Sequence, residues 1–412
     1  MKFYFLFLIS FAYFSVFSQA DKINVLFIGN SITYFNDMPQ SFKEIADSKG
    51  DSVEVTVYAP GGTGFIHYYI DPNVYNYFRE GTWDVIILQP GSNESPGYSY
   101  PISQTLMEAR IMLDSAYKYN PCAKILYYEI TYGIWGNTLT DITNYNNTMD
   151  LIRANLTYLA DSTKNFFAPA GEVISHLWNE NPDSMFWGSY GDIHPNYKGS
   201  YIIACAFYSS VFQKPSFGTT YFNSVDTAEA EYFQQVSDSI VLNHFSLWRI
   251  NSYNQSVYFD VISGFDSFSF ENLSENYDSL QWSFGNGQYS NEINPEIQYE
   301  EAGDYIVNLD TWFHGCQASQ TDTIHFSGTE IEQLVNDQII TVWPIPAKDF
   351  VYIKSENTDF NCETELFNVI GEVILKTKDG MIQISNFEKG CYIVRVKNME
   401  TGNVSVFKII KE

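Results

Sequence analysis

The sequence predicts an α/β domain, with a parallel sheet covered by helices on both faces, followed by two small all-β units. Near-continuous apolar runs alternate with helix-like runs from residue 22 to about residue 250. Beyond Asn251, short alternating strands and turn residues take over, and no helix of useful length follows. Apolar strands that alternate with helices are typical of a parallel sheet buried on both faces. A chain of 412 residues also exceeds what one hydrophobic core supports.

The first domain is expected to hold strands and helices in alternation. The predicted strands are Ile23–Gly29, Val53–Ala59, Trp83–Gln89, Lys124–Ile130 and Asn165–Ala168. The predicted helices are Met38–Lys49, Ser103–Tyr119, Asn144–Ala160 and Asn196–Phe212. Active sites in such sheets lie beyond the carboxyl ends of the strands. Candidate catalytic residues are therefore sought in the segments that follow each strand.

The first twenty residues have the pattern of a cleaved signal peptide. Lys2 supplies a short positive start, Phe3–Phe17 is apolar or aromatic apart from two serines, and small or polar residues occupy 18–20. The run is too short to span a bilayer comfortably. No later segment reaches about eighteen consecutive apolar residues. We therefore expect an exported, soluble mature protein without stable membrane insertion.

Charge narrows the range of partners. The formal net charge is −27 at pH 7. A field of this sign repels polyanions, which excludes nucleic acid and anionic membranes and favours a neutral substrate. Aromatic residues make up 17% of the chain. They suit sugar-facing surfaces and β-rich cores alike, and the cores are the simpler explanation.

The cysteines indicate neither a metal site nor a disulfide framework. Cys122, Cys205, Cys316, Cys362 and Cys391 have no CxxC or metal-ligand spacing. Their number is odd, so at least one cannot pair within the chain. Cys205 lies in an apolar helical run and is expected to be a buried thiol.

Ser31 directly follows the first predicted strand, in the run Leu26-Phe27-Ile28-Gly29-Asn30-Ser31. A serine at such a strand-to-helix turn holds its hydroxyl over the edge of the sheet. The helix N-terminus behind it favours negative charge. The alternatives are an N-cap serine or a phosphate loop. A phosphate loop needs more glycines and a lysine, and neither is present.

The segments after the second and third strands hold candidate hydrogen-bond donors. Gly61 and Gly62, within residues 59–65, allow backbone N–H groups to approach a bound oxygen closely. In residues 89–94, the side-chain amide of Asn93 can donate to a developing oxyanion, and so can that of Gln89. Both segments also fit plain turns.

A histidine precedes the last predicted helix of the first domain. His194 lies in the run Gly191-Asp192-Ile193-His194-Pro195-Asn196. A lone histidine is usually structural. In a polar loop at a helix start, however, it is exposed enough to act as a general base.

These four segments, in this order, resemble the conserved blocks of the SGNH (GDSL-type) hydrolases. The resemblance rests on Gly29-Asn30-Ser31, a glycine after the second strand, Gly91-Ser92-Asn93, and an Asp/His pair before the final helix, and it covers residues 21–250. It implies a flavodoxin-like three-layer α/β/α fold. The flanking runs Asn36-Asp37-Met38-Pro39 and Gly199-Ser200-Tyr201 fit a bacterial branch of that family.

The resemblance also implies catalytic roles. Ser31 would be the nucleophile and His194 its base, while the oxyanion hole would comprise the N–H groups of Ser31 and Gly62 and the side chain of Asn93. Neither a metal nor an organic cofactor is implied.

Two features depart from the family pattern. The family places the aspartate three residues before the histidine, where this chain has Gly191, and the aspartate here is Asp192. Gln89-Pro90 also displaces the third block, which leaves Gln89 as an alternative oxyanion donor to Asn93. Gly61 is a comparable alternative to Gly62.

The downstream units resemble known accessory modules. Residues 255–328, with Trp282-Ser283-Phe284-Gly285-Asn286-Gly287, resemble a PKD domain, an immunoglobulin-like β-sandwich. A polar, acidic linker is expected at 327–339. Residues 340–412, with Trp343-Pro344-Ile345-Pro346, resemble the C-terminal sorting domain of the type IX secretion system. The implied partner is the secretion machinery, and the implied location is secreted or cell-surface.

The implied activity is ester hydrolysis through an acyl-serine intermediate, by a secreted serine esterase. O-acetylated carbohydrate, small or polymeric, is the preferred substrate class. A lipase or thioesterase would share the same catalytic residues and show a wide apolar pocket. A degenerate hydrolase that only binds surface glycans is the remaining alternative, and the displaced aspartate favours it.

Overall fold

The computed structural model describes residues 22–264, 267–326, 340–355, 361–400 and 402–412. The predicted signal peptide at 1–20 and the predicted linker at 327–339 lie outside the described residues.

A five-stranded parallel sheet forms the centre of the first domain. Its strands are β1 (Ile23–Ile28), β2 (Val53–Tyr58), β3 (Val85–Leu88), β4 (Lys124–Tyr128) and β5 (Phe166–Ala168), in the order β2-β1-β3-β4-β5. All four neighbouring pairs are parallel. This is the flavodoxin-like order, and it confirms the predicted fold class.

The register aligns the carboxyl ends of the strands that precede the predicted site. Ile28, the last residue of β1, pairs with Tyr58 at the end of β2 and with Leu88 at the end of β3. Leu88 pairs in turn with Tyr127 of β4. The segments that follow these four strands therefore leave the sheet at one edge, which is where this fold class binds its ligands.

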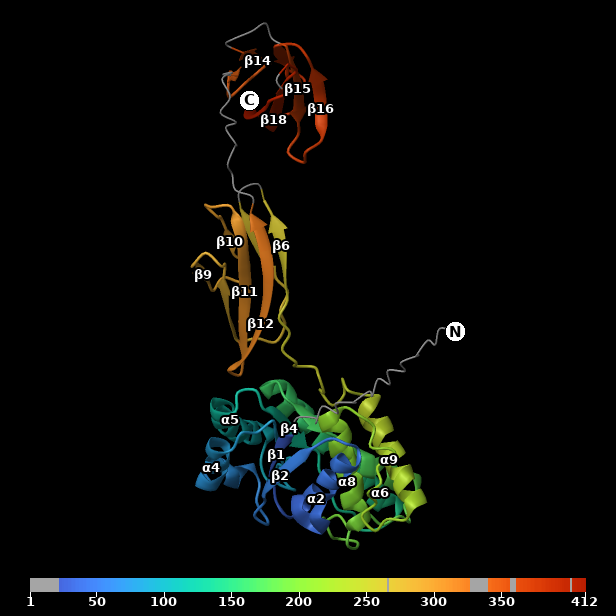
Figure 1. Ribbon diagram of the computed structural model, residues 1–412. Coiled ribbons are helices and arrows are strands. Elements are labelled where there is room, and N and C mark those ends of the chain that lie inside the picture. The colour runs from blue at the N-terminus through green and yellow to red at the C-terminus, as the bar shows by residue number, and fades with distance from the viewer. Residues whose placement is uncertain (1–21, 265–266, 327–339, 356–360, 401) are drawn as a thin grey trace, which may run out of the picture. The chain divides into compact units, whose positions relative to one another are not determined.

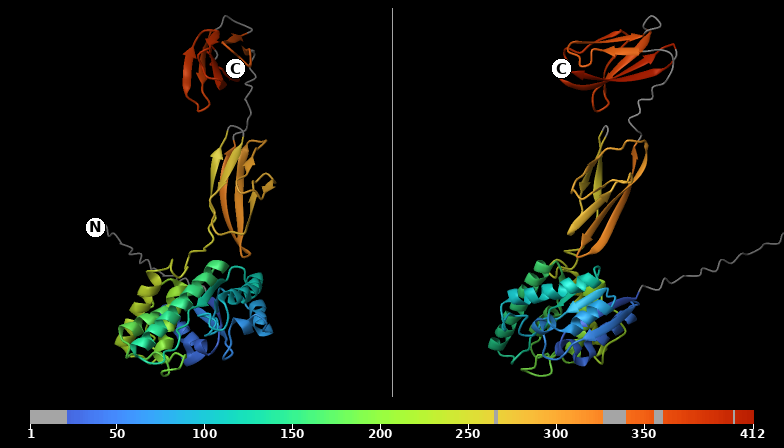
Figure 2. Two further views of the ribbon diagram at one scale, coloured as in Figure 1. Left: turned by 180° about the vertical axis from the view of Figure 1, so that it is seen from behind. Right: turned by 90° about the vertical axis from the view of Figure 1, so that its left-hand side faces the viewer.

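Helices flank the sheet on both sides. They are α1 (Ser31–Tyr34), α2 (Met38–Ser48), α3 (Phe65–Tyr68), α4 (Pro72–Glu80), α5 (Ile102–Tyr119), α6 (Leu139–Thr163), α7 (Ala170–Glu180), α8 (Tyr197–Phe212) and α9 (Thr227–Leu242). A 3₁₀ turn, Phe35–Asp37, separates α1 from α2. In Figure 1, α4 and α5 lie on one side of the strands and α8 and α9 on the other, and Figure 2 gives the reverse view of the same layers.

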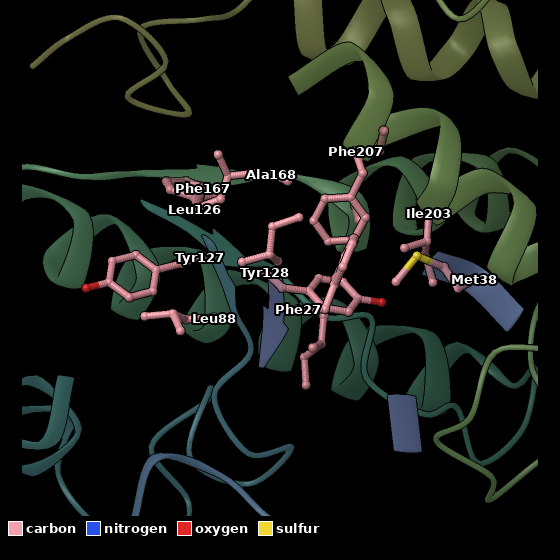
Figure 3. Close-up of a cluster of buried hydrophobic side chains, with 14 of the residues drawn as sticks. Phe27, Met38, Leu88, Leu126, Tyr127, Tyr128, Phe167, Ala168, Ile203 and Phe207 are labelled. Atoms are coloured by element: carbon pink, nitrogen blue, oxygen red, sulfur yellow. The ribbon is translucent and has the colours of Figure 1, made fainter. Parts of the chain in front are cut away.

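The apolar core explains why helices cover both faces of this sheet. Every residue of β3 is buried, as are the last four of β1. Figure 3 shows Phe27 of β1, Tyr128 of β4 and Phe207 of α8 meeting within this core. The Phe207 ring meets both of the others edge-on, at 5.5 Å from Phe27 and 5.0 Å from Tyr128. Such contacts fix α8, and with it the loop that precedes α8.

Most predicted elements are confirmed, but five helices are absent from the predicted set. Two of them, α1 and α3, are four residues long, and the longer three are α4, α7 and α9. Start signals are present for two of them, since Asp71 caps α4 with Pro72 at its first position and Asp226 caps α9. The long helix α6 also begins earlier than predicted, at Leu139, because Thr138 and Asp141 form a capping box there.

The chain beyond residue 258 is all-β, as predicted, throughout its described part. Its first strands are β6 (Phe259–Ser263), β7 (Phe268–Asn272), β8 (Ser279–Ser283), β9 (Tyr289–Ser290), β10 (Glu296–Ile297), β11 (Gly303–Phe313) and β12 (Cys316–Phe326). They form sheets in the orders β10-β7-β6 and β12-β11-β8-β9. Trp282 is fully buried against Phe259 and Phe270, so it is a core residue.

The C-terminal strands form two further sheets around a core of their own. They are β13 (Ile340–Trp343), β14 (Phe350–Ser355), β15 (Cys362–Phe367), β16 (Val373–Thr377), β17 (Met381–Gln383), β18 (Gly390–Asn398) and β19 (Val404–Lys411). The sheet orders are β13-β14-β17 and β16-β15-β18-β19. Val351, Leu366 and Val394 are fully buried in this core. No helix within the described part of the chain is long and apolar enough to cross a membrane.

The expectation of no disulfide framework is wrong for one pair of cysteines. Cys122, in the turn after α5, is bonded to Cys316 at the start of β12, and 194 positions separate them. Local spacing gives no sign of a pair that only the tertiary structure brings together. Cys205 is a free, buried thiol, as predicted.

Peptide mapping tests this pairing. After free thiols are blocked, digestion of the non-reduced mature protein should yield one linked peptide pair that contains Cys122 and Cys316. Cys205 should carry the blocking group once the protein is denatured, which provides an internal control. Recovery of Cys122 as a blocked free thiol would contradict the assignment.

Candidate active site

Ser31 opens the helix that follows β1. Asn30 caps this helix, because its side-chain oxygen accepts a hydrogen bond from the N–H of Ile32 at 3.0 Å. Ser31 is thus the first helical residue and not the cap. Its own N–H has no acceptor within the helix, as is usual for a first-turn amide. Ser31 is half-buried, and its hydroxyl does not cap the helix, because Asn30 fills that role.

His194 contacts Ser31, although the two residues lie far apart in the sequence of the first domain. Its Nε2 lies 2.8 Å from Ser31 Oγ, although 163 positions separate the two residues. The imidazole stacks on Phe35, with ring centroids 4.0 Å apart and planes 18° from parallel. Asn36 donates a hydrogen bond to the carbonyl oxygen of Pro195 at 2.7 Å, which ties the residues after Ser31 to the loop that carries His194.

Asp192 reaches the far side of the same imidazole. Its Oδ1 lies 2.7 Å from His194 Nδ1 and also accepts the backbone N–H of His194 at 3.0 Å. The carboxylate therefore closes a turn onto the residue two positions ahead, a favoured conformation of aspartate. Gly191 makes the approach possible, because its φ of 80° is one that residues with a side chain rarely adopt.

Asp192 is held as a carboxylate. Partial burial acts to raise its pKa, but hydrogen bonds from the backbone and side chain of His194 outweigh that effect, so the pKa is lowered from its ordinary value. An ionised acceptor at Nδ1 favours the tautomer whose Nε2 can accept a proton from Ser31. Hydroxyl, imidazole and carboxylate thus form one continuous hydrogen-bonded chain.

The glycine turn after β2 lies beside α1. A side chain at Gly61 would come 3.3 Å from the hydroxyl of Tyr34, which belongs to α1. Gly62 has a φ of 71°. Neither N–H donates to a protein acceptor among the described residues, so both remain candidate donors to a bound oxygen.

Gln89 has a structural environment. It is fully buried, and its Oε1 accepts the N–H of Asn30 at 3.1 Å and the hydroxyl of Thr33 at 2.6 Å. Its Nε2 donates to Asn30 Oδ1 at 2.8 Å and to the carbonyl of Pro90 at 3.3 Å. The Gln89 amide therefore has no N–H left for a ligand. It joins the segment after β3 to the one that bears Ser31.

Asn93 is exposed in the loop after β3. Its backbone carbonyl accepts the N–H groups of Tyr98 and Ser99 at 2.9 and 3.1 Å, which hold the loop in place. Its side-chain Oδ1 accepts the hydroxyl of Tyr132 at 3.0 Å. No protein acceptor faces its Nδ2 among the described residues, so that end of the amide is open to a ligand.

Glu94 is a site-building residue that the sequence interpretation missed. It is 4% exposed, and its carboxylate accepts the N–H groups of Gly91 at 2.7 Å, Phe65 at 2.8 Å and Ile66 at 3.2 Å, with the hydroxyl of Tyr100 as a further donor. It thereby joins the glycine turn after β2 to the Asn93 loop. An acidic residue next to Asn93 was visible in the sequence, but its partners 28 and 29 positions away were not.

Exposed aromatic rings border this loop. Tyr98 is 54% exposed and Trp135 58% exposed. Tyr132 lies between them, stacked on Trp135 at 5.7 Å and edge-on to Tyr98 at 6.1 Å. The three rings form what we call the aromatic rim. A rim of this kind next to a polar site is typical of a ligand-binding surface.

The described residues include no group of three or more histidine, cysteine, aspartate or glutamate side chains placed to hold a metal ion.

Comparison with known proteins identifies the C-terminal domain. Residues 341–412 match the family model of the secretion system C-terminal sorting domain. This confirms the sorting domain predicted at 340–412 and marks the protein for export. No curated protein matches the chain.

Solved structures resemble the other parts of the chain. A DUF4886 family protein from Bacteroides uniformis is 14% identical, with a TM-score of 0.46, over 54% of this chain and 95% of its own. A putative SGNH hydrolase from Slackia heliotrinireducens is 16% identical, with a TM-score of 0.35, over 46% and 98%. The PKD1 domain of a Vibrio cholerae metalloprotease is 32% identical, with a TM-score of 0.17, over 17% and 94%.

Removing the Glu94 charge should destabilise the first domain. Glu94→Gln places an amide NH₂ among backbone N–H donors and leaves at least one of them unsatisfied, at a cost of about 1–3 kcal/mol. Thermal unfolding followed by near-ultraviolet circular dichroism should register a lower Tm. Glu231→Gln, at an exposed position on α9, is the matched control and should leave Tm unchanged. Equal Tm values for the two variants would mean that Glu94 does not hold the loops.

Proposed function

We propose that residues 21–250 form a secreted serine esterase with Ser31 as nucleophile, His194 as general base and Asp192 as the acid that orients it. One observation carries the proposal. Ser31 Oγ, both ring nitrogens of His194 and the Asp192 carboxylate lie in one chain, with contacts of 2.8 and 2.7 Å. That arrangement activates a hydroxyl for attack on a carbonyl carbon.

The reaction proceeds in two balanced steps. Ser31 Oγ bonds to the ester carbonyl carbon while its proton passes to His194 Nε2. The tetrahedral intermediate then collapses, the alcohol leaves with that proton, and the acyl group remains on Ser31. Water attacks the acyl-serine in the same way, delivers a proton to His194, and releases the acid as Ser31 recovers its proton.

The oxyanion formed in each step requires hydrogen-bond donors. We assign them to the N–H groups of Ser31 and Gly62 and to Nδ2 of Asn93, with Gly61 as the alternative glycine. Asn93 is preferred to Gln89 because the Gln89 amide is fully used within the fold. The Asn93 amide keeps its donor end open.

The proposed substrates are O-acylated carbohydrates, with acetyl esters preferred. The aromatic rim gives flat, exposed surfaces on which a sugar ring can pack. The strongly negative chain favours neutral substrates over anionic ones. Export by the C-terminal domain would bring the enzyme to polysaccharides outside the cell.

Replacing the nucleophile tests the serine mechanism. The wild-type protein should react with a fluorophosphonate at Ser31 and hydrolyse short-chain esters, whereas Ser31→Ala should lose both properties and remain folded. Ser189→Ala is a matched control, because Ser189 is an exposed serine of the loop that carries His194. Normal turnover by Ser31→Ala would refute the mechanism. An unlabelled, inactive wild type would instead support the glycan-binding alternative.

Replacing the acid tests the displaced aspartate. Asp192→Asn should lower kcat by up to about 10⁴-fold, because an amide no longer selects the required tautomer of His194. Asp183→Asn, at an exposed position upstream, serves as control. A loss of about tenfold or less in a well-folded Asp192→Asn protein would reduce the site to a Ser31–His194 dyad.

A further inference from the structure

The segment after β4 contacts both halves of the proposed site, although no motif includes it. Tyr132 donates a hydrogen bond to Asn93, on the oxyanion side. Two residues later, the carbonyl of Ile134 accepts the N–H of Gly191 at 2.7 Å, on the side of the acid and base. The segment therefore spans from the Asn93 loop to the loop of Asp192 and His194.

Gly133 allows this segment to approach the Asp192 loop closely. A side chain at this position would come 2.8 Å from the backbone oxygen of Asp192 and 2.9 Å from Ile193, closer than real side chains approach. The segment therefore lies against the backbone of the Asp192 loop. Tyr132 is fixed at the end of this contact, with its N–H directed at the sulfur of Met149 at 3.4 Å.

The chemistry of an amide makes the Tyr132 contact consequential. The two ends of the Asn93 side chain are of opposite kind, since oxygen accepts and nitrogen donates. An oxyanion is stabilised only by the nitrogen end. The phenol occupies Oδ1 and fixes the plane of the amide, so the Nδ2 end is the one presented to a substrate.

Tyr132 is suited to remain a donor. Burial, and secondarily the neighbouring Tyr98, raise the pKa of its phenol above the ordinary value, so the hydroxyl keeps its proton under ordinary conditions. Its ring is also held between Trp135 and Tyr98. The ring contacts therefore hold the hydroxyl in place for its hydrogen bond to Asn93.

We propose that Tyr132 is a positioning residue of the esterase, which orders the Asn93 amide as an oxyanion donor through its hydrogen bond to Oδ1. It acts through Asn93 and touches neither the acyl group nor Ser31. This inference rests on the proposed function and adds a residue that the four motif blocks do not contain.

Tyr132→Phe isolates the hydroxyl, because it retains the ring and both ring contacts. In the full mature protein, kcat for a p-nitrophenyl acetate substrate should fall about three- to tenfold, the size of one hydrogen bond, with KM unchanged. In the Asn93→Ala variant, kcat should fall about 10²–10³-fold. Tyr132→Phe should cause no further loss in the Asn93→Ala background, because its effect passes through that side chain.

The control is Tyr117→Phe, on α5. It also removes a tyrosine hydroxyl that donates to an asparagine side chain, in this case to Asn165 Oδ1 at 2.6 Å, outside the proposed site. It should leave kcat unchanged. A kcat for Tyr132→Phe equal to that of Tyr117→Phe, or a full additional loss in the Asn93→Ala background, would overturn the inference while wild-type activity still supports the esterase. A wild type that neither reacts at Ser31 nor hydrolyses esters would overturn both.

Discussion

The imidazole of His194 is the element on which the proposed site depends. It contacts Ser31 with one nitrogen and Asp192 with the other, and it stacks on Phe35. Ser31 and Phe35 follow β1, whereas the histidine comes from the loop before α8, far along the chain. The packing of Phe207 against Phe27 and Tyr128 holds α8 on the sheet. A core contact between aromatic rings thus helps to position the proposed base against the proposed nucleophile.

Buried polar groups organise the opposite side of the site. Gln89 joins the Ser31 segment to the segment after β3, and Glu94 joins that segment to the glycine turn. Both side chains are nearly or fully inaccessible, and an unsatisfied partner there is costly. Such networks act as a unit. Buried side chains that do not contact the substrate therefore hold the backbone donors of the proposed oxyanion hole in fixed positions.

The fold could be predicted from the sequence more completely than the contacts of the candidate site. Apolar strands in alternation with helices predicted the sheet, because burial on both faces leaves a continuous signal in the chain. Ser31 and His194 could be selected because each lies beside an element end. The bonds of Glu94 to the start of α3 and of Tyr132 to Asn93 could not be foreseen, since these partners lie 28 to 39 positions away and depend on the conformations of the loops. The reach of Asp192 depended on the backbone conformation at Gly191, which residue type alone permits but does not specify.

The Cys122–Cys316 bond gives the molecule a closed covalent ring. The ring contains Asp192, His194 and the whole stretch from β4 to β11, whereas Ser31 lies outside it and the sorting domain follows it. A protease that cuts once between α9 and β6 would open the ring without releasing a fragment. Proteolytic removal of the sorting domain would leave the ring intact. The linkage therefore keeps the residues between Cys122 and Cys316 covalently joined after a single cut among them, whether or not the sorting domain is still attached.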